Sequence, residues 1–180
     1  MTAEGREDSL YRRVLGARFE LLPDPLRSFH DSASGGRAEG VFRVERGPGL
    51  ARRIIAFFAG FPPSSEAVQV RLEVEVDGAM ERWTRDFDGH RMVSDQWQQG
   101  GLLVERFFPL RCSLALDADR EGLSFQVERS YLGPLPLPRA FNPRLITEAK
   151  VRDGGWHLLL RIEAPLFGLL VEYEGDLRCL

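Results

Sequence analysis

The chain has 180 residues, of which 43% are hydrophobic and 28% charged, and its formal net charge is -3. This length suits one well-buried core, and the composition is that of a folded protein rather than a disordered one. The negative balance offers no basic field for a phosphate backbone, so we predict no nucleic-acid binding. Two cysteines, Cys112 and Cys179, are too few for a disulfide framework or for a zinc site without clustered histidines.

Two features of the sequence bear on location. Residues 1–9 are polar and acidic and lack the apolar region of a secretory signal. The longest apolar stretch, Ile54–Phe61, is far shorter than the ~20 residues needed to cross a bilayer. We therefore expect a cytoplasmic protein without a transmembrane segment.

The N-terminal segment, residues 1–36, is predicted to be helical. Behind the capping pair Asp8-Ser9, apolar residues recur at helical spacing over Leu10–Phe19. Asp24-Pro25 then opens a short second turn. A strand follows over Ala38–Arg46, where the spacing changes to period two.

A second helix is predicted over residues 50–59, between Gly47-Pro48-Gly49 and Gly60. Apolar side chains cover most of its circumference, which is typical of a helix buried on more than one side. Arg52 and Arg53 lie near its start, where positive charge opposes the helix dipole. We expect these arginines to have a partner, either a carboxylate from a facing strand or an anionic ligand.

From Ala67 onward the sequence consists of runs in which apolar and polar residues alternate, as in half-buried strands. Asp-Gly and Gly-Gly pairs between the runs are typical of hairpin turns. Nothing of helical length separates them, which excludes parallel βαβ units. The runs are Val68–Val76, Met80–Phe87, His90–Trp97, Leu102–Phe108, Leu110–Leu116, Leu123–Tyr131, Leu145–Val151, Trp156–Ile162 and Leu169–Leu177.

These elements predict a mainly β (α+β) protein. Its strands form an antiparallel up-and-down meander that closes into a barrel or a strongly curved half-barrel, since long sheets tend to curl and remove their edges. We expect one domain over 1–180, with a helical segment at 1–36 and a β-rich body at 37–180. The inserted helix is predicted to plug the barrel with Phe57 and Phe58 nearly inaccessible. The alternative is a lid that touches a membrane with both rings exposed.

Seven short segments carry a resemblance to a known family, in the right order and over nearly the whole chain. They are Leu10–Gly16, Phe29-His30, Val44–Gly47, Phe61–Pro63, Glu81–Arg85, Gly101–Phe107 and Leu132–Pro138. On these segments the chain resembles a bacterial family known as domain of unknown function 4166. The resemblance implies members that occur alone or fused behind a dehydrogenase-like nucleotide-binding domain. It implies no activity, and it suggests a dehydrogenase-like protein as a partner.

No catalytic or metal motif is complete. His30, His90 and His157 are far apart, with no metal spacing between them and no carboxylate that completes a local triad. The glycines match neither nucleotide-binding fingerprint, and no serine lies in a nucleophile elbow. We assign no catalytic residue, no metal and no cofactor, and favour a non-enzymatic role.

Charged residues on apolar faces are the candidate ligand contacts. Alternation places Arg46 beside Val44, Arg85 beside Trp83, and Arg129 beside Val127; in Leu102–Phe108 either Glu105 or Arg106 must point inward. Burying an unpaired arginine costs on the order of several kcal/mol, so such residues must be paired, hydrated or bound to a ligand. The alternative is that these charged residues lie at strand ends, where their side chains reach into solvent. The candidates are Arg46, Trp83, Arg85, Glu105, Arg106 and Arg129.

The pattern favours binding of a small apolar molecule with a polar or anionic head inside the curved sheet. One alternative is an accessory domain that docks on a dehydrogenase-like partner through the proline-rich loop Leu132–Pro138. Another is an enzyme in which Glu105 and an arginine form an acid/base pair. Ile54–Phe61 and the proline-rich loop can also serve as a homodimer contact.

Overall fold

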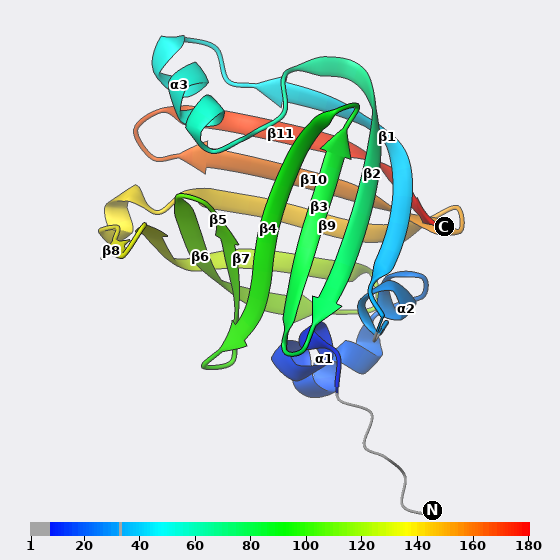
Figure 1. Ribbon diagram of the computed structural model, residues 1–180. Coiled ribbons are helices and arrows are strands. Elements are labelled where there is room, and N and C mark those ends of the chain that lie inside the picture. The colour runs from blue at the N-terminus through cyan, green and yellow to red at the C-terminus, as the bar shows by residue number, and fades with distance from the viewer. Residues whose placement is uncertain (1–7, 33) are drawn as a thin grey trace, which may run out of the picture.

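The protein is a closed antiparallel β-barrel with helices at both ends (Figure 1). The structure, a computed structural model, describes residues 8–32 and 34–180. The expected absence of a secretory signal concerns residues 1–9, most of which lie outside the described residues. Among the described residues, no helix combines the length and apolar character that a membrane crossing requires.

Ten strands of the described chain form the barrel wall. They are β1 (Gly36–Arg46), β2 (Ser65–Asp77), β3 (Met80–Phe87), β4 (His90–Gln99), β5 (Leu102–Phe107), β6 (Leu110–Ala118), β7 (Gly122–Leu132), β9 (Arg144–Arg152), β10 (Gly155–Ala164) and β11 (Gly168–Cys179). A short strand, β8 (Leu135–Pro136), pairs only with the end of β7. The predicted mainly β fold and meander are confirmed, and the barrel is closed rather than half-open.

Closure depends on two long-range pairings. β1 pairs with β11 along nearly its whole length, which joins the first strand to the last. β7 pairs with β6 on one side and with β9 on the other, but the β7–β9 pairing spans only Gly122–Ser124. The wall is therefore weakest between β7 and β9, where β8 and the short 3-10 helix η2 (Arg139–Phe141) fill the connection.

Hairpin turns have the chemistry that the sequence indicates. Asp88 and Gly89 both have positive φ, at 49° and 94°, as the tight turn between β3 and β4 requires. Glycine tolerates this region without steric cost, and aspartate is one of the few other residues that enter it.

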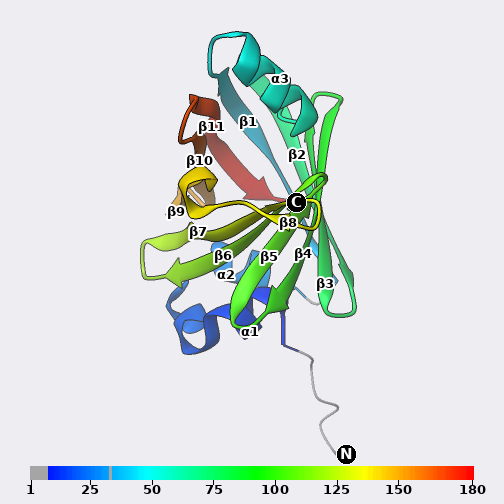
Figure 2. The same ribbon diagram turned by 90° about the vertical axis from the view of Figure 1, so that its left-hand side faces the viewer.

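Because successive strands are antiparallel, their connections alternate between the two ends of the barrel. One end is covered by α1 (Leu10–Leu15), the 3-10 helix η1 (Gly16–Leu21) and α2 (Leu26–His30), as Figures 1 and 2 show. Ser9 caps α1 by accepting a hydrogen bond from the Arg12 amide. The predicted helix over Leu10–Phe19 is thus divided, because the backbone at Gly16 has a φ of 56°.

The opposite end, which we call the rim, carries the segments 47–64, 88–89, 108–109, 133–143 and 165–167. Its largest element is α3 (Leu50–Phe58), which lies across this end of the barrel (Figures 1 and 2). Ile55, Ala56 and Ala59 face the barrel, whereas Phe57 and Phe58 are 76% and 67% exposed.

The prediction that this helix plugs the barrel with Phe57 and Phe58 nearly inaccessible is therefore wrong, because α3 has the opposite orientation. The helix lies on the barrel through one face only, and its small residues, Ala56 and Ala59, are the ones that fit closely against the wall. Arg52 finds backbone carbonyls as partners, those of Phe167 and of Pro48, the latter at 2.7 Å from Nη1. Within residues 8–32 and 34–180, no carboxylate forms an ion pair with Arg52.

Candidate ligand cavity

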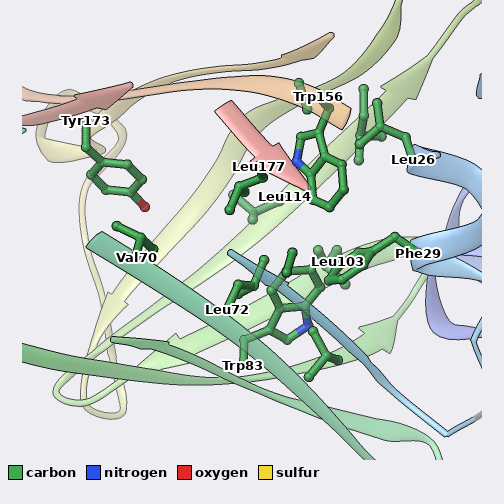
Figure 3. Close-up of a cluster of buried hydrophobic side chains, with 14 of the residues drawn as sticks. Leu26, Phe29, Val70, Leu72, Trp83, Leu103, Leu114, Trp156, Tyr173 and Leu177 are labelled. Carbon is green, nitrogen blue, oxygen red and sulfur yellow. The ribbon is translucent and has the colours of Figure 1, made fainter. Parts of the chain in front are cut away.

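The barrel interior contains two chambers that share a wall of side chains. The inner chamber lies beside the N-terminal helices and the outer chamber beside α3, and each has a volume of about 100 Å³. Figure 3 shows Trp83 and Trp156 converging from opposite walls, with Phe29 entering from the helical end. Six residues line both chambers: Arg85, Glu105, Leu114, Leu145, Leu160 and Tyr173. The chambers therefore meet at these side chains.

A polar cluster occupies this meeting point. Arg85 donates from Nη1 to the Ser94 hydroxyl at 2.9 Å and from Nη2 to Glu105 Oε1 at 3.1 Å. The Ser94 hydroxyl donates to the same Glu105 oxygen at 2.6 Å. The side chains of Arg85 and Glu105 each keep 16% of their surface accessible. Since both line both chambers, this accessible part faces the cavity.

The neighbours of Arg85 keep it charged in this buried position. Burial is the largest single influence and lowers the pKa of Arg85, but the charge and hydrogen bond of Glu105, together with Tyr173 and Tyr11, outweigh it, and the pKa is raised. The guanidinium also lies over the Trp83 ring, with 5.4 Å between Cζ and the ring centroid. The cluster is therefore a neutralised ion pair inside an otherwise apolar barrel.

Tyr173 adds a hydroxyl to the cluster from the opposite wall. Its ring packs against Phe42 and Phe87, with centroids 6.1 and 5.5 Å away. Burial raises the pKa of Tyr173 to about 12, so the phenol stays protonated. Among the described residues the hydroxyl has no hydrogen-bond partner, and it is available to a molecule in the cavity.

The inner chamber is aromatic but holds polar atoms without partners. His30 lies 3.9 Å from Tyr11 and 5.6 Å from Trp83, centroid to centroid. Burial lowers the pKa of His30 to about 3, which keeps its imidazole neutral. Its Nδ1 and the Thr147 hydroxyl are buried without a hydrogen-bond partner in the described chain. Such atoms are rare in native interiors and are commonly satisfied by water or a ligand.

The outer chamber lies toward the rim. Ile55, Ala59 and Phe61 contribute to its lining from α3 and the segment after it, and Pro143 contributes from the connection before β9. Cys112 lies in this chamber with its sulfur 3.5 Å from the Ser130 hydroxyl. Burial raises the pKa of the Cys112 thiol to about 11, which disfavours its reactive thiolate.

Of the six candidates from the sequence, the structure brings Trp83, Arg85 and Glu105 together in the cavity. The other three lie elsewhere. Arg46 binds the backbone carbonyls of Pro62 and Phe61 at the end of β1. Arg106 is exposed and pairs with Asp95 at 2.8 Å, and Arg129 is also exposed.

Arg129 faces outward because of a β-bulge. The pairing of β6 with β7 shifts between Ser113 and Leu114, which are opposite Arg129 and Val127. The extra residue, Glu128, reverses the alternation, so Val127 and Ser130 point inward while Arg129 points out. Simple alternation across the bulge placed it on the wrong face.

Sequence reasoning missed several polar residues of the cavity. Ser94 and Gln96 point inward from β4, and Gln96 accepts a hydrogen bond from the Tyr11 hydroxyl at 3.0 Å. Their alternation with Met92 was the available signal, but the outward positions of β4 mix polar residues with Val93 and Trp97, so the pattern did not distinguish the two faces. Tyr173 alternates with the buried Val171, and this pattern marked it only as a core residue.

The donor groups do not form a metal centre. Within residues 8–32 and 34–180, no three histidine, cysteine, aspartate or glutamate side chains are arranged to hold an ion. The cavity offers hydrogen-bond donors and acceptors surrounded by apolar walls, an arrangement typical of small-molecule sites.

Comparisons with known proteins agree with the resemblance seen in the sequence. A search among curated proteins gives no match. No solved structure matches either. One family model matches residues 22–177, which cover α3 and all ten strands of the barrel except the last two residues of β11. The chain therefore belongs to the family described as Domain of unknown function (DUF4166).

Proposed function

We propose that the barrel binds a small apolar molecule with a polar head and does so without chemical conversion. The observation that carries this proposal is the Arg85–Ser94–Glu105 cluster with the Tyr173 hydroxyl, set between two apolar chambers. Polar groups inside a barrel are costly unless they are satisfied. A ligand whose polar head bonds to the cluster and whose apolar part fills a chamber satisfies the polar groups and also occupies the apolar space.

An uncharged head fits the cluster better than an anionic one. Arg85 is already neutralised by Glu105, so an anion here has to displace that carboxylate or bear its repulsion. A hydroxyl or carbonyl oxygen instead accepts a hydrogen bond from the Tyr173 hydroxyl, and a hydroxyl group also donates one to Glu105. The unpartnered His30 Nδ1 and Thr147 hydroxyl belong to residues that line the inner chamber, and they offer further polar contacts.

The chamber volumes limit the size of the ligand. Each chamber, at about 100 Å³, is smaller than the ~150 Å³ cavity that accommodates benzene. We therefore propose a ligand that places a short apolar chain, rather than an aromatic ring, in each chamber, with the polar group between them. A long-chain lipid exceeds this space.

Binding is tested by native mass spectrometry of the purified protein, followed by titration of the released molecule onto the apo form. Tyr173→Phe removes one hydroxyl and keeps the ring, so the fold should remain while affinity falls by about fivefold to tenfold. Leu160→Trp fills the meeting point of the chambers and should abolish binding. Val41→Thr, on the outer wall, is the matched control and should bind normally. Protein that is free of any bound molecule, and that takes up no small apolar alcohol or ketone in titration, would refute the proposal.

A further inference from the structure

The rim carries an apolar surface that nothing in the described chain covers. On α3, Leu50, Ile54, Phe57 and Phe58 follow one another at helical spacing on the outward face, and all four are exposed. Leu166 in the β10–β11 turn is 70% exposed, and this turn is held beside α3 by the hydrogen bond from Arg52 to the Phe167 carbonyl. We call these exposed side chains, which lie on neighbouring segments, the apolar edge.

The apolar edge extends around the rim. Phe108 in the β5–β6 turn, Leu135 in β8 and Phe141 in η2 are also exposed. Antiparallel topology places all of these segments at the same end of the barrel (Figure 2). By contrast, the four turns at the opposite end, residues 78–79, 100–101, 119–121 and 153–154, contain no large apolar side chain. Contiguous exposed apolar surface of this kind marks an interaction site.

The connecting segments at the two ends of the barrel also differ in charge. The rim segments contain three arginines, Arg52, Arg53 and Arg139, and one carboxylate, Asp88. The turns at the opposite end contain three carboxylates, at positions 119, 121 and 153, and one arginine. Arg53 borders the apolar stripe of α3, and neither Arg53 nor Arg139 has a carboxylate within ion-pair distance in the described chain. The rim therefore combines apolar side chains with unneutralised positive charge.

We propose that the rim docks on an anionic lipid bilayer. An amphipathic helix with an aromatic face and flanking arginines binds the interfacial region by inserting its apolar residues while the cations meet lipid phosphates. A second copy of the chain is a poorer occupant. A twofold contact through this surface would bring two surfaces of net positive charge together, and like charges repel.

The docked surface adjoins the outer chamber. Ile55 and Ala59 line that chamber from the inward side of α3, while Phe57 and Phe58 lie on the outward side of the same helix. A bilayer at the rim thus lies one helix away from the cavity. Docking does not depend on the proposed function, because it rests on the outer face of the rim and not on the cavity.

The test is sedimentation of the full chain with vesicles. The probes are phosphatidylcholine alone and phosphatidylcholine mixed with phosphatidylglycerol, each at low and high salt. We expect binding to the anionic vesicles about tenfold tighter than to the neutral ones, with the difference lost at high salt. Phe57→Ser/Phe58→Ser should weaken binding by about tenfold or more, and Arg53→Glu by about fivefold or more at low salt.

Two control variants show whether vesicle binding requires the rim itself. Val41→Ser/Val93→Ser removes two exposed apolar side chains from the barrel wall and should leave vesicle binding unchanged. Tyr173→Phe alters only the cavity and should also bind vesicles normally. Vesicle binding can therefore be tested separately from the proposed binding of a ligand in the cavity. Equal binding to both kinds of vesicle, or no binding to either, overturns the proposal. The proposal is also overturned if sedimentation velocity shows that the natural protein is a dimer that binds no vesicles, while the Phe57→Ser/Phe58→Ser variant is a monomer.

Discussion

Arg85 on β3 and Glu105 on β5 form an ion pair across β4, with 3.1 Å between Nη2 and Oε1, inside the barrel. Ser94 on the intervening β4 bonds to both partners. Each charge neutralises the other inside the barrel, where burying either charge without its partner would destabilise the fold. The pair therefore joins three neighbouring strands and also presents the main polar surface of the cavity.

Removing one partner of this pair should destabilise the protein strongly. Arg85→Met leaves Glu105 buried without its cation, and we expect a loss of about 3–5 kcal/mol in the free energy of unfolding. The double variant Arg85→Met/Glu105→Gln should lose less than the sum of the two single changes. Urea denaturation measures all three. Arg37→Met breaks the exposed pair with Glu73 and should cost less than about 1 kcal/mol. Equal effects of the Arg85 and Arg37 variants would contradict this assignment.

The exposed position of Phe58 gives a second prediction. Phe58→Ala should change the free energy of unfolding by no more than about 0.5 kcal/mol, because the ring is 67% exposed. Phe42→Ala removes a ring that is 1% exposed and should cost about 3–5 kcal/mol. Thermal or chemical denaturation compares the two. A Phe58 variant as unstable as the Phe42 variant would show that α3 packs the other way round.

His30 should make stability depend on pH in the acid range. Its pKa is lowered by burial from 6.5 to about 3, so between these values the unfolded chain binds a proton that the folded chain does not. The free energy of unfolding must then fall as pH decreases through this window, by at most ~1.4 kcal/mol per pH unit from this group. Titrating other groups, such as Glu81 with its raised pKa, add their own dependence.

The contribution of His30 is isolated by comparison with His30→Phe, which keeps an aromatic ring beside Tyr11 and Trp83. Unfolding free energies at several pH values between about 6.5 and about 4 should fall more steeply for the natural protein than for the variant. The expected difference is about 3 kcal/mol over that range. Parallel curves would mean that His30 is protonated in the folded state.

The two thiols should react at very different rates. Cys179 is exposed, whereas Cys112 is buried in the outer chamber with a pKa raised to about 11. A maleimide reagent at neutral pH should modify Cys179 quickly and Cys112 only slowly. In a Cys179→Ser variant, the remaining reaction should follow opening of the barrel and accelerate in urea. Rapid labelling of Cys112 in that variant, without denaturant, would show that the outer chamber is open to solvent.

The sequence alone determined the order and type of nearly all elements. Alternation in runs such as Val68–Val76 and turn pairs such as Asp88-Gly89 are local signals, because strand pleating and turn geometry depend on neighbouring residues. The inward position of Trp83 and Arg85 also followed from alternation, since both lie in one uninterrupted strand. Closure was expected as one of two outcomes, because open edges of a long sheet are unfavourable.

Only the tertiary structure decided which face of several elements turns inward. Alternation in Leu102–Phe108 left Glu105 and Arg106 equivalent, and it was the pairing of Glu105 with Arg85 and Ser94 that selected the inward residue. Arg129 turned outward because a bulge depends on the register between β6 and β7, which lies in the pairing and not in either strand. The helix from Leu50 carries apolar residues around most of its circumference, so the sequence did not show which of them pack on the barrel. Close packing of Ala56 and Ala59 against the barrel left Phe57 and Phe58 exposed, because small side chains allow the nearest approach of helix and wall.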